Sequence, residues 1–362
     1  MSQTDGNGTG GDAGGSGDGT DVRLAEGIDH QVAMVMDLNK CIGCQTCTIA
    51  CKTNWTDGGG REYMYWNNVE TRPGSGYPRE WEEMGGGWTE DGEEREPGEL
   101  PDTEDYGRAW EFNHEQIMYE GSDEPLRPMD QADWGPNWDE DEGAGEYPNS
   151  YYFYLPRICN HCTHPSCVEA CPRSALYKRE EDGIVLVDQD RCRGYRYCVE
   201  GCPYKKVYYN AMKKTSEKCI FCYPRIEGDG PDGEVRPPSC AADCPPQLRM
   251  VGFLDDEEGP IHKLVNEYEV AVRLHPEYRT EPNVYYIPPF APPQHSERGE
   301  SVEAERIPRT YLEELFGPDV NEALNTIERE RSKVERGEDS EVMEMLTTED
   351  TADQYRLEVF DR

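Results

Sequence analysis

Short runs of mainly apolar and aromatic residues, set between polar segments, predict five β-strands along the chain. They cover residues 31–36, 151–155, 183–187, 207–210 and 249–253. In the first stretch, Val32, Met34 and Met36 occupy every second position, with Val35 between them, which predicts a short strand. Each stretch stands close to a cluster of cysteines. The pattern therefore predicts small sheets that deliver cysteine-rich loops, with a helical turn opening at Cys51.

The remaining segments carry a weaker pattern. Residues 1–22 are mainly Gly, Asp, Ser and Thr, which predicts a disordered acidic tail. Residues 54–150 form an insertion rich in Trp, Gly and acidic side chains, interpreted either as loops draped over the cysteine-rich region or as a docking surface. From residue 274 the chain is Pro-rich and extended, and apolar residues then recur at near-helical spacing. These residues, which predict helical packing faces, are Leu312, Leu315, Phe316, Val320, Leu324, Ile327 and Val334.

One cysteine run carries the clearest chemistry. Cys192, Cys198 and Cys202 fit the iron–sulfur spacing C-x2-C-x2-C-x3-C-P, but Tyr195 occupies the second ligand position. Because this leaves one iron corner unheld, the run predicts a three-iron cluster. An upstream copy of the same spacing is complete and consists of Cys41, Cys44, Cys47 and Cys51. Such an internal repeat is typical of duplicated ferredoxin modules.

Two further sets of cysteines complete the inventory. They are Cys159, Cys162, Cys167 and Cys171, and then Cys219, Cys222, Cys240 and Cys244. The total of 15 is odd and most cysteines are tightly clustered, which disfavours a disulfide framework. Four-ligand zinc sites pair two short C-x2–4-C units and do not use the dense spacing seen here. Iron–sulfur ligation is therefore the preferred interpretation.

In two-cluster ferredoxins the fourth cysteine of a run ligates the other cluster, so the cysteine runs pair into modules. If the outer runs pair and the inner runs pair, three 4Fe-4S clusters follow. Their ligands are Cys41, Cys44, Cys47 and Cys244; Cys51, Cys219, Cys222 and Cys240; and Cys159, Cys162, Cys167 and Cys202. Cys171, Cys192 and Cys198 then remain for a 3Fe-4S cluster. Every cysteine is used once, although the outer-and-inner nesting is an assumption.

The charge balance narrows the class of partner. The chain has 36 basic and 75 acidic residues and a net charge of −39, which argues against a nucleic-acid partner and predicts a solvated acidic surface like that of proteins from salt-loving organisms. The main basic concentration either raises cluster potentials or is ordinary surface lysine; it consists of Lys205, Lys206, Lys213, Lys214 and Lys218. His161 and His164 flank full ligand positions and are interpreted as structural. No direct membrane span and no export signal are expected.

Several longer stretches resemble the beta subunit of respiratory nitrate reductase. They are residues 65–81, 135–138, 177–194, 202–206 and 216–227, within a resemblance that extends over residues 30–290. Members of that family commonly have Trp where this chain has Tyr195, and neither aromatic side chain is a ligand. The stretches 245–252 and 274–289 are more similar to sister subunits that serve dimethylsulfide dehydrogenase, ethylbenzene dehydrogenase, selenate reductase or chlorate reductase.

The resemblance implies an electron-transfer subunit with three 4Fe-4S clusters and one 3Fe-4S cluster and with no catalytic residues of its own. Its expected partners are a molybdenum-containing catalytic alpha subunit and a membrane cytochrome b-type subunit. It would be membrane-associated through them, on the extracytoplasmic face by co-export with the catalytic subunit or, alternatively, on the cytoplasmic face. The substrate of the partner stays open, and a free-standing soluble polyferredoxin is the alternative from another class.

The expected fold class is α+β, with two ferredoxin-like 4Fe-4S modules, long insertions and an extended, partly helical C-terminal region. Residues 30–53 and 205–260 would form the outer module, and residues 151–204 the inner module. The insertion at 54–150 and the C-terminal region at 261–362 would surround them.

Overall fold

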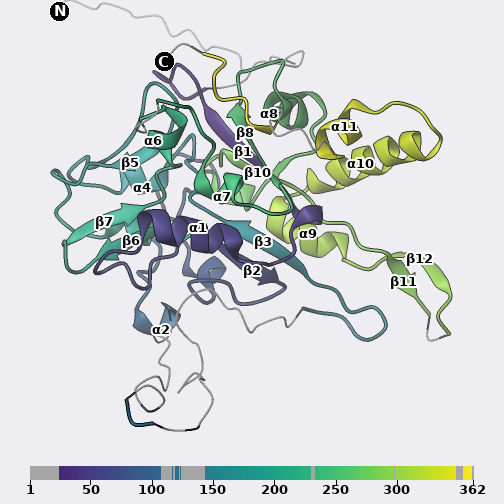
Figure 1. Ribbon diagram of the computed structural model, residues 1–362, viewed down its shortest axis with the longest axis horizontal. Coiled ribbons are helices and arrows are strands. Elements are labelled where there is room, and N and C mark those ends of the chain that lie inside the picture. Colours follow the sequence, from purple (N-terminus) through teal and green to yellow (C-terminus); the bar gives the residue numbers. More distant parts are fainter. Residues whose placement is uncertain are drawn as a thin grey trace, which may run out of the picture.

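A four-stranded sheet lies at the centre of the computed structural model (Figure 1). The structure describes residues 24–106, 143–229, 233–296, 298–347 and 354–360, together with 116, 119–121 and 123. The strand order is β8-β1-β10-β9, formed by β8 (Arg249–Phe253), β1 (Val32–Asp37), β10 (Val284–Ile287) and β9 (Val272–Arg273). β1 runs antiparallel to β8 and parallel to β10. All three of these strands are buried along their whole length.

The pairing of β1 with β8 joins two distant parts of the chain. β1 leads through a 3-10 turn (η1, Leu38–Lys40) into the first cysteine run, and β8 follows directly after the last cysteines. In the register of the two strands, Met36 lies opposite Arg249. Helix α1 (Thr46–Trp55) packs against the short helix α7 (Ser239–Ala242) beside them. The first and last cysteine runs therefore meet at one end of the sheet.

Three two-stranded antiparallel sheets carry the other runs. They are β2 (Asn68–Arg72) with β3 (Phe153–Arg157), β4 (Leu176–Lys178) with β5 (Val185–Val187), and β6 (Val207–Asn210) with β7 (Thr215–Lys218). Short helices fill the loops between them: α4 (Ser166–Glu169), α5 (Tyr197–Gly201) and α6 (Tyr223–Ile226). In Figure 1 the β4–β7 region lies on one side of the central sheet, and α1 crosses in front. The result is a mixed α/β protein with small sheets and clustered cysteines.

The C-terminal part supplies helices on the other side of the sheet (Figure 1). α8 (Pro260–His262) continues into a π-turn (η3, Lys263–Glu267), and a 3-10 turn (η4, Pro276–Tyr278) precedes β10. The hairpin of β11 (Pro293–His295) and β12 (Ser301–Glu305) projects from the body, followed by α9 (Arg309–Phe316), α10 (Val320–Glu335) and α11 (Glu341–Thr347). The predicted apolar stripe is buried at six positions, whereas Val334 in the last turn of α10 is half exposed. The helical prediction is confirmed.

The insertion packs inward in the part that the structure describes. It contains a 3-10 turn (η2, Trp81–Met84) and a short helix, α2 (Thr103–Tyr106). Trp66, Tyr77, Trp81 and Trp88 are all buried, so these aromatic side chains belong to the core and do not form an exposed contact surface. This burial supports draped loops for residues 54–106. The stretch 135–138 and the tail at 1–22 lie outside the described residues.

A buried charge network ties β2, a strand within this insertion, to its antiparallel partner β3. Glu70 on β2 is buried and accepts hydrogen bonds from Arg157 Nε (2.7 Å) and Arg72 Nη2 (2.9 Å). Burial alone would raise the pKa of Glu70, but the two guanidinium groups outweigh burial and lower it to about 2. Removing one partner of such a buried pair typically costs about 3–5 kcal/mol. The network therefore stabilises the frame behind the cysteine loops.

The strand predictions agree with the structure at β1, β5, β6 and β8, and β3 lies two residues beyond the predicted stretch. Two predictions need correction. Cys51 lies inside α1 and does not open a helical turn, because the helix already begins at Thr46. The Pro-rich stretch after residue 274 is not only extended chain, because Val284–Ile287 forms β10 in the middle of the main sheet.

Candidate iron–sulfur sites

The openings of all four cysteine runs share one backbone feature. The residue just before the second ligand position has a positive φ in all four runs: Gly43 (66°), His161 (44°), Gly194 (69°) and Phe221 (54°). This left-handed conformation is easy for glycine and costly for other residues. In the last run it lets the amide of Phe221 donate to Cys219 Sγ at 3.4 Å. Such turns point backbone N–H groups at a bound anionic centre.

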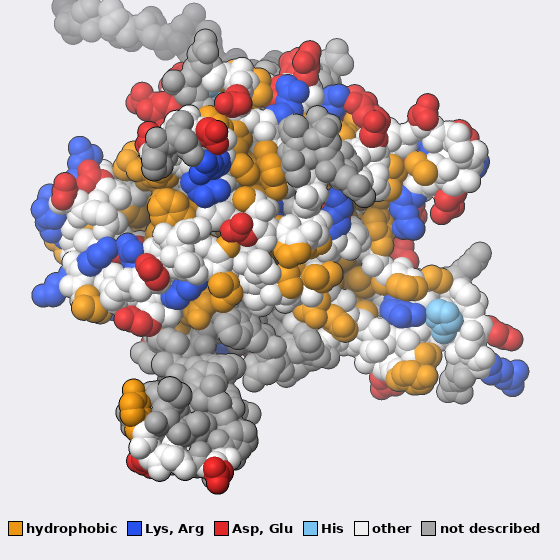
Figure 2. All heavy atoms as spheres, in the orientation of Figure 1, with side chains coloured by type: hydrophobic (Ala, Val, Ile, Leu, Met, Phe, Trp, Pro, Cys, Tyr) orange, Lys and Arg blue, Asp and Glu red, His pale blue; other side chains and the backbone are white. Residues whose placement is uncertain are grey.

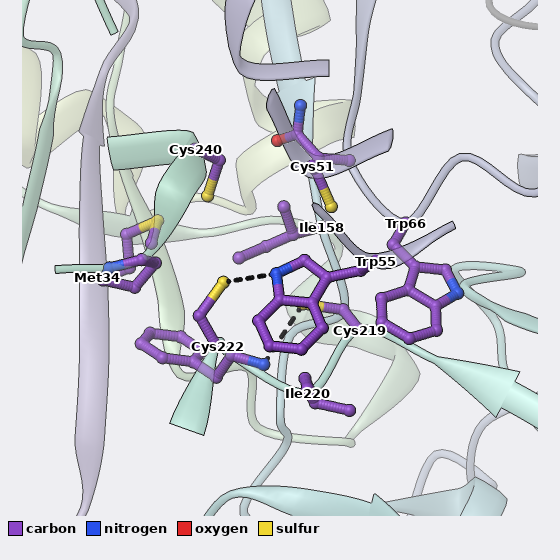
Figure 3. Close-up of a pocket in the computed structure, with 12 residues that line it drawn as sticks. Met34, Cys51, Trp55, Trp66, Ile158, Cys219, Ile220, Cys222 and Cys240 are labelled. Carbon is purple, nitrogen blue, oxygen red and sulfur yellow. Dashed lines mark hydrogen bonds between the residues drawn. The ribbon is translucent and has the colours of Figure 1, made fainter. Parts of the chain in front are cut away.

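The second cysteine group, defined here as Cys51, Cys219, Cys222 and Cys240, lines one buried hollow. Figure 3 shows their sulfur atoms facing this shared space, with Trp55 and Ile158 beside them. Trp55 Nε1 donates to Cys222 Sγ at 3.1 Å. Burial raises the pKa of the Cys51 thiol well above its usual value, and the thiols of Cys219 and Cys240 raise it further. The four thiols therefore come together from three separate segments.

The third cysteine group lines a second hollow and consists of Cys159, Cys162, Cys167 and Cys202. Burial raises the pKa of Cys162 to about 12, and the neighbouring Cys159 thiol adds to this shift. His161 Nδ1 accepts the amide of Val185 at 3.1 Å. His164 stacks on Trp88 with ring centroids 3.8 Å apart. Both histidines therefore contact other parts of the protein, as a structural role requires.

The first cysteine group joins the two ends of the cysteine-rich region and consists of Cys41, Cys44, Cys47 and Cys244. Burial raises the pKa of Cys41 to about 12, and the thiols of Cys47 and Cys244 contribute to the rise. The pKa of Cys244 is raised by burial and then by the Cys47 and Cys44 thiols. Cys44 is exposed, whereas Cys47 and Cys244 are buried. This group therefore reaches the surface.

The fourth group contains only three cysteines, Cys171, Cys192 and Cys198, around a hollow that Tyr195 also lines. The amides of Ala175 and Ser216 donate to Cys171 Sγ and Cys192 Sγ, both at 3.3 Å. Burial raises the pKa of Cys198 to about 12, and the thiols of Cys171 and Cys192 add to the shift. Tyr195 is 58 % exposed and brings no thiol to the site.

The chemistry of this donor set fits iron–sulfur clusters. Buried thiols that raise one another's pKa resist ionisation unless a positive centre faces them, and cluster iron supplies that charge. Among the described residues, no set of three or more His, Cys, Asp or Glu side chains is arranged for a single metal ion. A four-iron cluster binds each thiolate through a different iron atom, so its ligands stand farther apart than those of one ion.

The groups also adjoin one another. The pKa of Cys240 in the second group is raised by burial and also by Cys47 and Cys244 of the first group. Burial and then the Cys159 thiol of the third group raise the pKa of Cys219. The third and fourth groups share α4 and α5, because Cys167 and Cys198 lie on these two packed helices. The sites thus follow one another in the order first, second, third, fourth.

Basic side chains lie among these sites in a way that the sequence did not reveal. Lys205, Lys206 and Lys218 are buried, so they are not ordinary surface lysines, whereas Lys213 and Lys214 are exposed. Lys218 Nζ donates to the carbonyl oxygens of Val185 and Cys219. Arg249, which no sequence pattern singled out, is fully buried between the first two groups.

Comparisons with known proteins agree with this chemistry. Residues 150–254 match a family described as a 4Fe-4S dicluster domain. The chain is 77 % identical over 345 residues to the respiratory nitrate reductase subunit beta of Haloferax mediterranei, covering 95 % of this chain and 98 % of that protein. It is 58 % identical to the dimethylsulfide dehydrogenase subunit beta of Rhodovulum sulfidophilum, over 88 % and 96 % of the two chains. Identity to the selenate reductase subunit beta of Thauera selenatis is 53 %, over 91 % and 99 %.

The fold, the thiol groups and the dicluster match define an iron–sulfur protein with 4Fe-4S clusters, of the class that transfers electrons. More particularly, the chain belongs to the family of beta subunits of respiratory nitrate reductase, the electron-transfer subunits of that complex. Within the described residues, no helix has both the length and the apolar character needed to cross a membrane.

Proposed function

We propose that this chain carries three 4Fe-4S clusters and one 3Fe-4S cluster, bound by the four cysteine groups defined above. The observation that carries this proposal is the partition of all 15 cysteines into three neighbouring sets of four and one set of three. The pairing of β1 with β8 supports two nested ferredoxin-like modules, because it joins the first run to the last. The cofactors supply the redox chemistry, while the protein sets their spacing and potentials.

The order of the groups makes the chain a linear relay. The first group is open to the surface at Cys44, and Ile42 and Ile49 beside it are 63 % and 49 % exposed. The fourth group is flanked by the exposed side chains of Tyr195 and Tyr197. Exposed apolar and aromatic side chains of this kind are enriched at protein interfaces. Electrons would enter at one end of the relay and leave at the other.

The end of the relay at the fourth group carries a concentration of basic side chains. Arg191, Arg193, Arg196, Lys213 and Lys214 are exposed near the fourth group, on a chain whose net charge is −39. Figure 2 shows Lys and Arg side chains gathered at the end of the visible face that holds β6 and β7. Electrostatic complementarity of this kind guides partner orientation. We therefore assign the two ends to two different partners, a molybdenum-containing alpha subunit and a membrane cytochrome b-type subunit.

The proposed reaction of the complex is nitrate reduction, supported by the similarity to the Haloferax mediterranei subunit. The second candidate is the same relay in a dimethylsulfide, selenate or chlorate enzyme, favoured by identities of 53–58 % to three such subunits. Purification of the tagged chain from its host would decide between them. Molybdenum together with nitrate turnover supports the proposal, whereas molybdenum with turnover of another substrate supports the second candidate.

The same purification tests whether the chain works alone. A native mass well above 41.3 kDa is expected for the complex. A molybdenum-free monomer with intact clusters would instead support a free-standing polyferredoxin. We further propose attachment to the extracytoplasmic face of the membrane through the partners. Labelling of intact cells with a membrane-impermeant reagent checks this, because protection of the chain until lysis would place it on the cytoplasmic face.

A further inference from the structure

Three of the cysteines have a similar sequence around them, but the residue five positions later is of a different type in one of the three. Cys171, Cys202 and Cys244 are each followed by proline, and each of these runs enters a strand five residues later. The residues at that position are Leu176, Val207 and Arg249, the first residues of β4, β6 and β8. All three are buried, so two copies place an apolar side chain where the third places a guanidinium.

A guanidinium in this position needs a counter-charge. Arg249 is 0 % exposed, and arginine stays protonated in proteins. Its Nη2 donates to Asn67 Oδ1 at 2.7 Å, and its Nη1 lies 3.5 Å from Cys240 Sγ and 3.7 Å from Met34 Sδ. Within the described part of the chain, no carboxylate forms an ion pair with it. A buried cation without an anionic partner is strongly unfavourable.

The missing negative charge lies in the two flanking cysteine groups. The guanidinium contacts Cys240 Sγ, and Arg249 stands opposite Met36 on β1, the strand that leads into the first cysteine run. Cys240 belongs to the second group, and Cys244 of the first group precedes Arg249, the first residue of β8, by five residues. The guanidinium therefore faces both sites at once.

We propose that Arg249 is the shared counter-charge of the first two clusters and raises the reduction potential of both. The inference rests on the proposed ligand groups. Reduction adds one electron to a cluster, and a fixed cation in a water-poor interior stabilises the added negative charge. Arg249 is a positioning and tuning residue, because it acts through the clusters and binds no substrate.

The test is an EPR-monitored redox titration of the purified complex carrying Arg249→Leu, the residue type found at the equivalent position of β4. Two four-iron clusters should become harder to reduce, with at least a tenfold smaller equilibrium constant, which is about 59 mV for a one-electron couple. Arg249→Lys keeps the charge and should restore potentials close to those of the unaltered protein. Unchanged potentials in the leucine variant, or an equal fall in the lysine variant, would overturn the proposal.

Arg273→Leu is the matched control. Arg273 lies on β9 of the same sheet and donates to the carbonyl of Pro282 and the hydroxyl of Tyr285, so its loss removes the same charge away from the thiols. The cluster potentials of this variant should equal those of the unaltered protein. A second control uses Lys218→Met, since Lys218 lies beside the second and third groups and should leave the first cluster unaffected.

Iron analysis separates failure of this inference from failure of the proposed function. Unaltered protein that lacks clusters in the first two groups would contradict the ligand assignment itself. Intact clusters with unchanged potentials in the Arg249→Leu variant would contradict only the role of Arg249. If Arg249→Leu does not assemble its clusters, Arg249→Gln is titrated in its place. If neither neutral variant assembles but Arg249→Lys does, the charge requirement is supported. Cluster loss in the lysine variant as well would contradict it.

Discussion

The two copies of the repeated cysteine run share a backbone and differ in one ligand. Gly43 and Gly194 precede the second ligand position with φ values of 66° and 69°. Gln45 and Arg196 follow it with φ values of 58° and 66°, and each is the residue before a helix, α1 or α5. Between them stands Cys44 in one copy and Tyr195 in the other.

This difference teaches that the loop conformation does not depend on the ligand at its centre. The turn is set by the positive-φ residues and by the helix that follows, and both survive the replacement of cysteine by tyrosine. The side chain at the second position lies at the surface in both copies. A ligand can therefore be exchanged there without disturbing the core, and the type of cluster can change while the fold stays the same.

The largest expected effect comes from removing a cysteine from the fourth group, which has only three. Cys198→Ala leaves the fourth group with two thiols, too few to hold a three-iron cluster. We expect loss of the three-iron EPR signal and loss of electron transfer through the complex. Retention of that signal at full intensity would show that Cys198 is not a ligand.

A second variant gives the first run the same ligand pattern as the run that contains Tyr195. Cys44→Tyr leaves Cys41, Cys47 and Cys244 in place, and the exposed position accommodates the ring. We expect a second three-iron signal in the oxidised protein with the fold retained. Cys44→Ala is the control for the ring itself and should give the same signal. If the first site keeps four iron atoms in both variants, Cys44 is not a ligand of that cluster.

The glycines before the second ligand should differ in their tolerance of a side chain. A Cβ at Gly194 would stand 2.6 Å from the carbonyl oxygen of Lys214, whereas a Cβ at Gly43 would meet the ring of Tyr154 at 2.6 Å. A side chain can move more easily than backbone. Both substitutions place a non-glycine residue at positive φ, which costs about 1–3 kcal/mol. Because the Cβ at Gly194 also meets backbone, Gly194→Ala should destabilise the protein more than Gly43→Ala. Denaturation midpoints of the two loaded variants measure this, and the reverse order would contradict the account.

The smallest effect is expected at the hydroxyl of Tyr195. Tyr195→Phe removes the only polar atom of the ring, which is exposed and is not needed as a ligand. The three-iron signal, its potential and the iron content should stay unchanged. A changed signal would indicate that the phenol oxygen contacts the cluster.

Local signals predicted much of the fold. Val207–Asn210 and Arg249–Phe253 have the lengths and the apolar or β-branched residues of strands, and the structure has strands at these positions. β10 was missed because the prolines around Val284–Ile287 indicate extended chain, while its place beside β1 depends on a long-range pairing. The spacing of the cysteines similarly identified the four runs. That the first and last runs lie close together, however, depends on the pairing of β1 with β8.

The burial of charged side chains could not be predicted from the sequence, for a different reason. Lys206 and Lys213 look alike in the sequence, yet Lys206 is buried and donates to Asn68 Oδ1, whereas Lys213 is about half exposed. Arg249 begins a strand that looks apolar, and only the packing of two cysteine groups around it shows its role. Burial of a charge depends on which anionic partners meet it, and these come from distant segments.

The most direct test of the comparison is EPR and iron analysis of the intact, cluster-loaded protein in its oxidised and reduced states. The account predicts one three-iron signal per chain in the oxidised protein and signals from three four-iron clusters on reduction. Absence of the three-iron signal from fully loaded protein would contradict it, because the run with Tyr195 would then hold a complete four-iron cluster or none.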